Sequence, residues 1–152
     1  MGEPIRTERG ARPLWVCPKC DRSFASLNAT HACGPLTNLD DHFRGKSNEV
    51  RAIFDAIVGE VKRFGPVTVL PEKTRIALQV RISFAAFTPR RHWLNGHLVL
   101  ARRIDSPRFT RIETFSPRNV LHAFRLSSAE EVDAELVGWL AEAYQVGLQR
   151  HT

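Results

Sequence analysis

The chain has 152 residues, of which 43% are hydrophobic and 25% charged, and its formal net charge is +6. This length predicts one domain, or one domain with a small appendage, with enough residues to form a hydrophobic core. No apolar run reaches the roughly 18 residues that a membrane-spanning helix needs, and no secretory signal peptide is recognisable. We therefore expect a cytoplasmic protein that has no membrane partner.

The most specific pattern lies in residues 14–34, which contain all three cysteines and one histidine. The first two cysteines are separated by two residues, and a histidine and the third cysteine follow after ten more. A C-x2-C turn supplies two thiolates, and a second pair completes the tetrahedral site that zinc prefers. The segment is therefore predicted to be a zinc knuckle with one structural Zn²⁺. The predicted ligands are Cys17, Cys20, His31 and Cys33.

The alternative to a zinc site is a set of buried or disulfide-linked cysteines. Three is an odd number for disulfides, and reduced thiols in a cytoplasmic protein are free to bind metal. Trp15 and Phe24 flank the first pair as in the small core of a zinc finger. The second ligand pair has the form H-x-C and follows a spacer of ten residues. A helix in this segment must be short, so it has little room for side chains that read bases. A structural role for the metal is therefore favoured over base recognition or catalysis.

His42 is a further candidate metal ligand near this segment. It is interpreted as a surface or capping residue, because the other four residues already fill a tetrahedral site.

The remaining sequence predicts one α+β domain. Residues 1–13 mix charges without an apolar block and are predicted to be a disordered tail. Residues 35–46 form a linker with a short helical turn, and the domain itself covers residues 47–150. Apolar residues recur at three- and four-residue steps from 47 to 64, which predicts a helix. A second helix is expected from the capping box at residues 128–131 to about Leu148.

Between the two predicted helices the sequence is typical of an antiparallel sheet. Residues 75–84 alternate between apolar and polar side chains and are predicted to be one strand, with Arg75 and Arg81 on its polar face. Further strands are expected within 92–101, 111–115 and 120–126, joined by turns that are too short for crossover helices. The predicted fold is thus a small zinc knuckle followed by an antiparallel sheet of four or five strands, with two helices on one face.

Positive charge is concentrated in the predicted sheet. Residues 73–125 contain 11 Lys or Arg and 2 Asp or Glu, whereas residues 126–152 contain 1 and 5. This pattern indicates a cationic surface that binds nucleic acid or another polyanion. The alternative is a solvated basic face that the acidic last helix partly neutralises. The candidate anion-binding residues are Arg75, Arg81, Arg90, Arg91 and Arg125. Side chains that could stack on bases are Phe87, His92, Trp93 and His97.

No catalytic motif is recognisable. A metal-dependent nuclease needs clustered carboxylates, and the sheet offers only Asp105 and Glu113, with Glu72 and Lys73 at its edge. The histidines on predicted strands are isolated in sequence. Binding without catalysis is therefore favoured, and no catalytic residue is assigned. The alternative is an enzyme that acts on a phosphorylated or anionic substrate in a pocket between sheet and helices, with arginines as electrostatic clamps.

Several segments together resemble a bacterial family. These are W-V-C-P-K-C, F-A-S-L-N-A-T-H-A-C, T-R-I-A-L-Q-V-R-I-S-F-A-A-F-T-P-R-R and S-S-A-E-E-V-D-A-E-L-V-G-W-L-A-E-A-Y. The chain from Trp15 to about Tyr144 resembles small proteins that join a CCHC zinc knuckle to an α+β domain of unknown function (domain of unknown function 5655). The resemblance implies the four metal ligands and a bacterial cytoplasmic setting, but no activity. The domain also occurs beside nuclease- or restriction-associated modules, which favours nucleic acid as a partner.

Overall fold

The computed structural model describes residues 13–18, 23–24 and 36–149, and the chain divides into two compact units, 1–35 and 36–152. In the first unit, β1 (Trp15–Val16) pairs with β2 (Ser23–Phe24) in an antiparallel hairpin. Cys17 directly follows β1 and is buried. The other predicted zinc ligands, Cys20, His31 and Cys33, lie outside the described residues.

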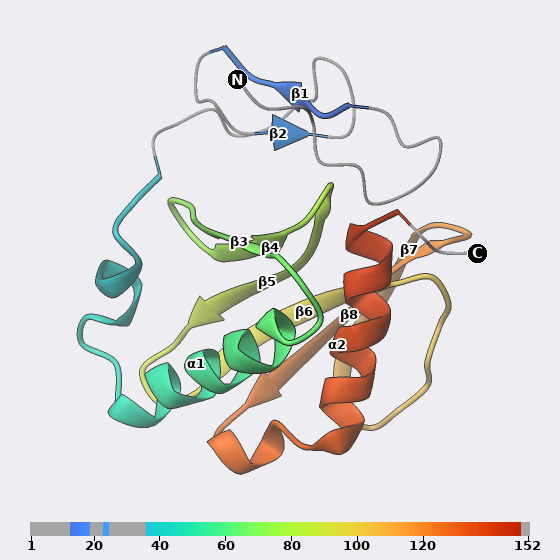
Figure 1. Cartoon of the computed structure of the whole chain (residues 1–152). Helices are drawn as coiled ribbons and strands as arrows, with labels where there is room; N and C mark the ends of the chain where they lie inside the picture. Colours follow the sequence, from blue (N-terminus) through green and yellow to red (C-terminus); the bar gives the residue numbers. More distant parts are fainter. Residues whose placement is uncertain (1–12, 19–22, 25–35, 150–152) are drawn as a thin grey trace. The chain divides into compact units, whose positions relative to one another are not determined.

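The second unit is an α+β domain (Figure 1). Its helical elements are η1 (Leu39–Phe43), α1 (Asn48–Lys62), η2 (Ala129–Glu131) and α2 (Ala134–Gly147). Its strands are β3 (Thr68–Pro71), β4 (Ile76–Gln79), β5 (Ser83–Pro89), β6 (Leu94–Leu100), β7 (Phe109–Ser116) and β8 (Asn119–Leu126). They form one antiparallel six-stranded sheet in the order β3-β4-β5-β6-β8-β7. The predicted α+β class, with an antiparallel sheet and two helices, is confirmed, but the predicted four or five strands were too few.

One cause of the wrong strand count is the segment predicted as a single strand over residues 75–84. It is two strands, β4 and β5, joined by a turn at residues 80–82. The backbone N–H groups of Arg81 and Ile82 donate to the carbonyl of Gly147 at 2.9 and 3.1 Å. The Nε of Arg81 donates to Oε1 of Gln149 at 2.8 Å. Arg81 is therefore a buried turn residue, only 7% exposed, and does not share an exposed strand face with Arg75.

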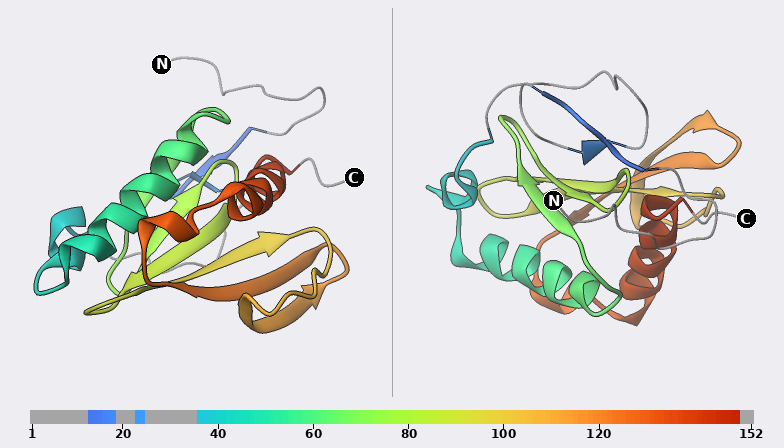
Figure 2. Two further views of the ribbon diagram at one scale, coloured as in Figure 1. Left: turned by 90° about the horizontal axis from the view of Figure 1, so that it is seen from below. Right: turned by 45° about the horizontal axis from the view of Figure 1, so that its top comes forward.

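Both helices pack on the same face of the sheet (Figure 2). The apolar stripe predicted for the first helix is buried there, with Ile53, Phe54 and Ile57 fully enclosed. The ring of Phe54 meets Phe87 of β5 edge-on, with 5.9 Å between the ring centroids. Among the described residues, no helix is long and apolar enough to cross a membrane.

The last helix begins later than the sequence predicts. Ser128 and Glu131 do form the expected capping box, but it caps only the short η2 turn. Helix α2 begins separately, after its N-cap residue Asp133. The carboxylate of Asp133 accepts from the backbone N–H of Leu136 at 3.0 Å. At this start of α2, the carboxylates of Asp133 and Glu135 also pair with Arg108, the residue before β7.

His122 of β8 is fully buried on the helix-covered side of the sheet. Its Nε2 accepts from the N–H of Ile104, and its Nδ1 donates to the carbonyl of Val120, both at 2.9 Å. Burial lowers the pKa of His122 below its ordinary value. Because both ring nitrogens are engaged by the backbone, His122 is a structural residue.

Gly96 provides a test of the packing between the central strands. A Cβ atom at this position would lie 2.7 Å from Cδ1 of Phe87 and 3.0 Å from Cε1 of Phe124. Gly96→Ala is therefore expected to lower the free energy of unfolding by about 1–3 kcal/mol, as overpacked cores do, when measured by urea denaturation. Gly59→Ala on α1 is the control. Its added methyl meets nothing within 4 Å, so higher helix propensity should raise stability by about 0.5–1 kcal/mol.

Candidate anion-binding site

The face of the sheet opposite α1 and α2, here called the helix-free face, has a row of small side chains around one histidine. Strand pairing places His97 of β6 beside Ala86 of β5 on one side and Ala123 of β8 on the other. Ala123 in turn pairs with Arg111 of β7. Neighbouring strands lie about 4.8 Å apart, so only a methyl group fills the position next to His97 on each side. This row leaves a hollow in the sheet surface.

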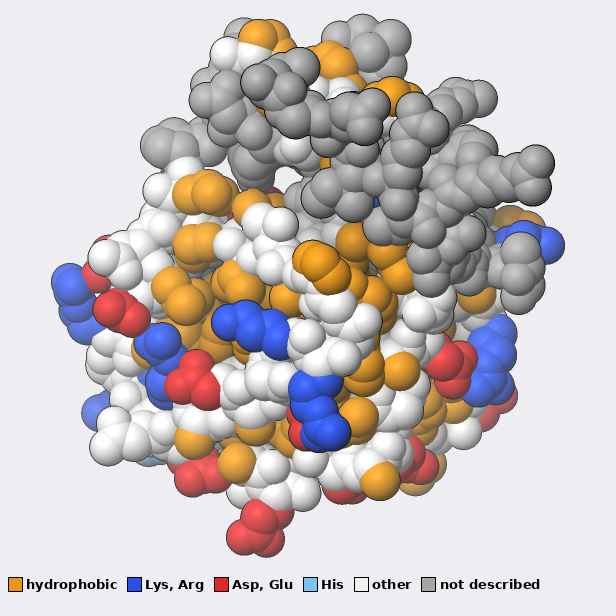
Figure 3. Space-filling view, in the orientation of Figure 1, with side chains coloured by type: hydrophobic (Ala, Val, Ile, Leu, Met, Phe, Trp, Pro, Cys, Tyr) orange, Lys and Arg blue, Asp and Glu red, His pale blue; other side chains and the backbone are white. Residues whose placement is uncertain are grey.

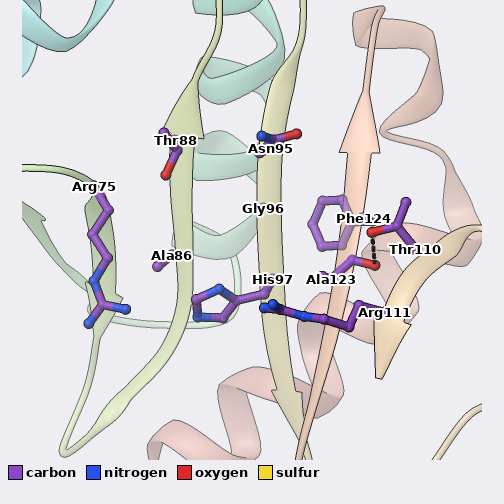
Figure 4. A pocket seen from close by; sticks show the side chains of 10 residues that line it. All are labelled: Arg75, Ala86, Thr88, Asn95, Gly96, His97, Thr110, Arg111, Ala123 and Phe124. Carbon is purple, nitrogen blue, oxygen red and sulfur yellow. Dashed lines mark hydrogen bonds between the residues drawn. The ribbon is translucent and has the colours of Figure 1, made fainter. Parts of the chain in front are cut away.

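The hollow has a volume of about 310 Å³ and is polar. The side chains around it come from β5, β6, β7, β8 and the residue before β4 (Figure 4). In this view the imidazole of His97 lies between the guanidinium groups of Arg75 and Arg111. Thr88, Asn95 and Thr110 add hydroxyl and amide groups. The arrangement offers several hydrogen-bond donors and two positive charges to a small anion.

Burial and two nearby arginines together determine the charge state of His97. Burial, and then the positive charges of Arg75 and Arg111, lower the pKa of His97 to about 4. The imidazole is therefore neutral at pH 7, and within the described chain its ring makes no hydrogen bond. Nε of Arg75 donates to Glu72 at 2.9 Å, and Nε of Arg111 lies 3.1 Å from Glu113. Within the described ranges, the terminal nitrogens of both guanidinium groups remain available to a ligand.

A second hollow, of about 440 Å³, adjoins the first and shares Asn95 and Thr110 with it. Its other lining residues are Arg90, Arg91, Trp93 and Arg125. The guanidinium carbon of Arg125 lies 4.8 Å from the ring centroid of Trp93, whose Nε1 donates to Oδ1 of Asn95 at 3.0 Å. The two hollows together are called the basic trough.

The structure brings four of the five predicted anion-binding residues to the basic trough. They are Arg75, Arg90, Arg91 and Arg125. Arg81 is separate from them, in the buried turn that precedes β5. Arg111 was not predicted, because only the pairing of β7 with β8 aligns it with His97. The only feature of the sequence that could have indicated this role for Arg111 is its position on a strand with alternating side chains.

Other cations of the sheet region are neutralised by acidic residues. Arg102 lies 3.0 Å from Glu142 of α2, and Arg108 lies 2.9 Å from Asp133. Figure 3 shows the helix-covered side, where Lys and Arg side chains lie beside Asp and Glu. The expected neutralisation by the last helix thus applies to these residues. In the described part of the chain, Arg90, Arg91 and Arg125 have no ion pair.

Other residues considered from the sequence have structural roles. Phe87 is only 1% exposed and packs in the core, so it cannot stack on a base. Asp105 pairs with Arg103 at 2.9 Å, and Glu113 pairs with Arg111. Within the described ranges no three His, Cys, Asp or Glu side chains cluster in a way that could hold a metal. Three of the four predicted zinc ligands lie outside these ranges.

Comparison with known protein families identifies the domain. Residues 39–147 match the family described as Domain of unknown function (DUF5655), which is more than half of the chain. The chain belongs to this family. The matched segment includes the whole six-stranded sheet, both α-helices and every residue of the basic trough. No curated protein and no solved structure matches the chain.

The lowered pKa of His97 has a measurable consequence. The unfolded chain takes up a proton on this residue near pH 6.5, whereas the folded chain does so only near pH 4. The contribution of His97 to folding stability is therefore fully present above pH 6.5 and is lost as the pH falls toward 4. His97→Asn, which cannot titrate, should show a smaller decline in urea unfolding between pH 7 and 4.5. An acid slope identical to that of the wild type would contradict this assignment.

Proposed function

We propose that the basic trough binds nucleic acid or another polyanion through its phosphate groups, without catalysis. The supporting observation is that five arginines, from the sheet and from the turn between β5 and β6, line two adjoining hollows on the helix-free face. They are Arg75, Arg90, Arg91, Arg111 and Arg125. Guanidinium groups bind phosphate oxygens through pairs of N–H donors and are the side chains best suited to this task.

The residues between the arginines support a ligand with both charged and planar parts. Trp93 has an aromatic surface at the trough, although Arg125 already stacks on it. Aromatic rings and arginines that line a positively charged groove are typical of proteins that bind single strands without strong sequence preference. Asn95 and Thr110, which border both hollows, can donate to sugar or base oxygens. A polymer that extends along β6 would contact all of these groups.

The alternative, an enzyme for an anionic substrate, is supported by one observation. The neutral imidazole of His97 lies between two arginines, and such an imidazole can accept a proton. Between the sheet and the helices the described residues leave a hollow of only about 70 Å³, lined in part by Arg108, Arg125 and Trp139, which is well below the roughly 300–1,000 Å³ of most ligand pockets. A site on the helix-free face would therefore replace the substrate pocket expected there. Release of phosphate from a phosphorylated substrate, abolished in His97→Asn, would favour this alternative.

We also propose that the first unit holds a structural Zn²⁺ ion at Cys17, Cys20, His31 and Cys33. The β1–β2 hairpin supports this, because its two strands flank the segment that contains the C-x2-C pair. Cys17 directly follows β1 and is 4% exposed, as a ligand of a closed structural site would be. Such a site provides folding energy to a small unit and no chemistry. A cytoplasmic location is part of this proposal, since it keeps the thiols reduced.

Charge reversal tests the proposed binding surface. The double variant Arg90→Glu/Arg125→Glu should bind a fluorescent oligonucleotide of mixed sequence at least tenfold more weakly in anisotropy titrations. Affinity of the wild type should fall with salt by about 0.7–0.9 decade per decade for each phosphate contact, and the variant should have a shallower slope. Lys62→Glu/Arg63→Glu at the end of α1 changes the net charge equally and should bind like the wild type. Equal losses in both double variants would indicate only a non-specific effect of net charge.

Metal analysis tests the zinc proposal. Purified protein should contain about one zinc per chain, as one tetrahedral site requires, and Cys20→Ser should contain much less. Because the α+β domain has its own core, removal of zinc by a chelator should leave its thermal unfolding transition in place. Protein with intact thiols and no metal, purified from zinc-supplemented medium, would contradict the proposal.

A further inference from the structure

We propose that the hollow bounded by Arg75, His97 and Arg111 is a site for a phosphomonoester group, such as the phosphate at the end of a nucleic acid strand. The inference rests on the proposed function, because it specifies which phosphate of an anionic ligand occupies this part of the basic trough. The second hollow, lined by Arg90, Arg91 and Arg125, would then contact the following phosphates of the same strand.

The first argument is steric. Ala86 and Ala123 pair with His97 on either side, so the floor of the hollow is formed by two methyl groups and an imidazole ring. Larger residues at the alanine positions would fill the space between the strands. The volume of about 310 Å³ is sufficient for a phosphate group and part of its attached sugar. The hollow therefore has room for a compact tetrahedral group next to His97.

The second argument concerns charge. A phosphomonoester carries about −1.5 to −2 charges at pH 7 and has three terminal oxygens, whereas a phosphodiester has one charge and two such oxygens. The hollow provides two guanidinium groups, from opposite sides of His97. Each uses its Nε for a neighbouring carboxylate, Glu72 or Glu113, and presents its terminal nitrogens elsewhere. Two cations that face one small space match the greater charge and the additional oxygen of the monoester.

The third argument concerns hydrogen bonding by His97. A neutral imidazole has one N–H donor and one nitrogen acceptor, and neither has a hydrogen-bond partner in the described chain. A phosphomonoester has one proton with a pKa near 6, so it can either donate a P–OH to the imidazole acceptor or pass that proton to the ring, and in both cases its P–O oxygens accept from a ring N–H. A phosphodiester has only acceptors, so it would leave the imidazole acceptor unpaired. The charged groups that face His97 are Arg75 and Arg111, and both favour the neutral ring until an anion binds.

The experiment compares oligonucleotides of one sequence that differ only at their ends. Strands with a 5′-phosphate, a 3′-phosphate or hydroxyls at both ends compete against a labelled strand in anisotropy titrations at fixed salt. One of the phosphorylated strands should bind about tenfold more tightly than the hydroxyl form, as an added charge-assisted contact provides. Inorganic phosphate and a mononucleotide are also tested as competitors, which separates a strand end from a free phosphorylated molecule.

Two variants connect the preference to the hollow. Ala123→Leu fills the space without changing charge and should remove the tenfold preference, so that phosphorylated and hydroxyl strands bind this variant with equal affinity. Ala52→Leu on the exposed surface of α1 is the matched control. His97→Leu removes the donor and the acceptor and should have the same effect as Ala123→Leu, which keeps the test valid if the alanine variant does not fold.

The outcomes separate this inference from the proposed function. Equal affinity of wild-type protein for phosphorylated and hydroxyl strands would overturn the phosphomonoester site but leave polyanion binding in place. No binding of any strand at low salt would overturn the proposed function itself. A mononucleotide that competes as well as the phosphorylated strand, and loses this ability in Ala123→Leu, would support the site with a small phosphorylated molecule as its ligand.

Discussion

The structure depends on the large hydrophobic core on one face of the sheet, whereas on the other face the described residues bury a smaller cluster, Leu70, Ala77 and Ala86. On β6, Leu94, Leu98 and Leu100 are fully buried against the helices, and Asn95 and His97 alternate with them on the opposite face. Because side chains along a strand alternate with a period of two, a shift of one residue would exchange the two sets. The hydrophobic contacts of the leucines therefore fix the positions of the polar residues. The geometry of the basic trough is thus a consequence of the core.

Small residues are needed on both faces of the central strands, for different reasons. On the buried face Gly96 leaves room for the rings of Phe87 and Phe124, whose centroids are 6.4 Å apart. On the opposite face Ala86 and Ala123 leave room beside His97 and nothing in the described structure fills it. In a core, space between strands is normally filled by side chains. Space that the chain itself leaves open next to charged residues is characteristic of a binding site.

Local periodicity and turn signals were sufficient to predict α1, most of α2, a strand in the region of β6 and the packing of both helices on one face of the sheet. They failed at residues 80–82, where the turn has no glycine, proline or asparagine and is held by bonds to Gly147 and to the side chain of Gln149. They also could not predict that Arg111 would join His97, because the order β6-β8-β7 depends on pairing between distant segments. Sequence therefore indicated which residues are basic, but strand order decides which of them converge.

Charge counted along the sequence also differs from charge available at the surface. Arg108 contacts Asp133 and Glu135 and lies over the ring of Trp139, so it stabilises the start of α2 and is not available to a ligand. The arginines of the basic trough have fewer compensating carboxylates, and like charges held close together destabilise the folded state. The lowered pKa of His97 keeps a further charge out of this region. An arrangement that costs stability and contributes nothing to the core is most simply explained by an anionic ligand that relieves the repulsion.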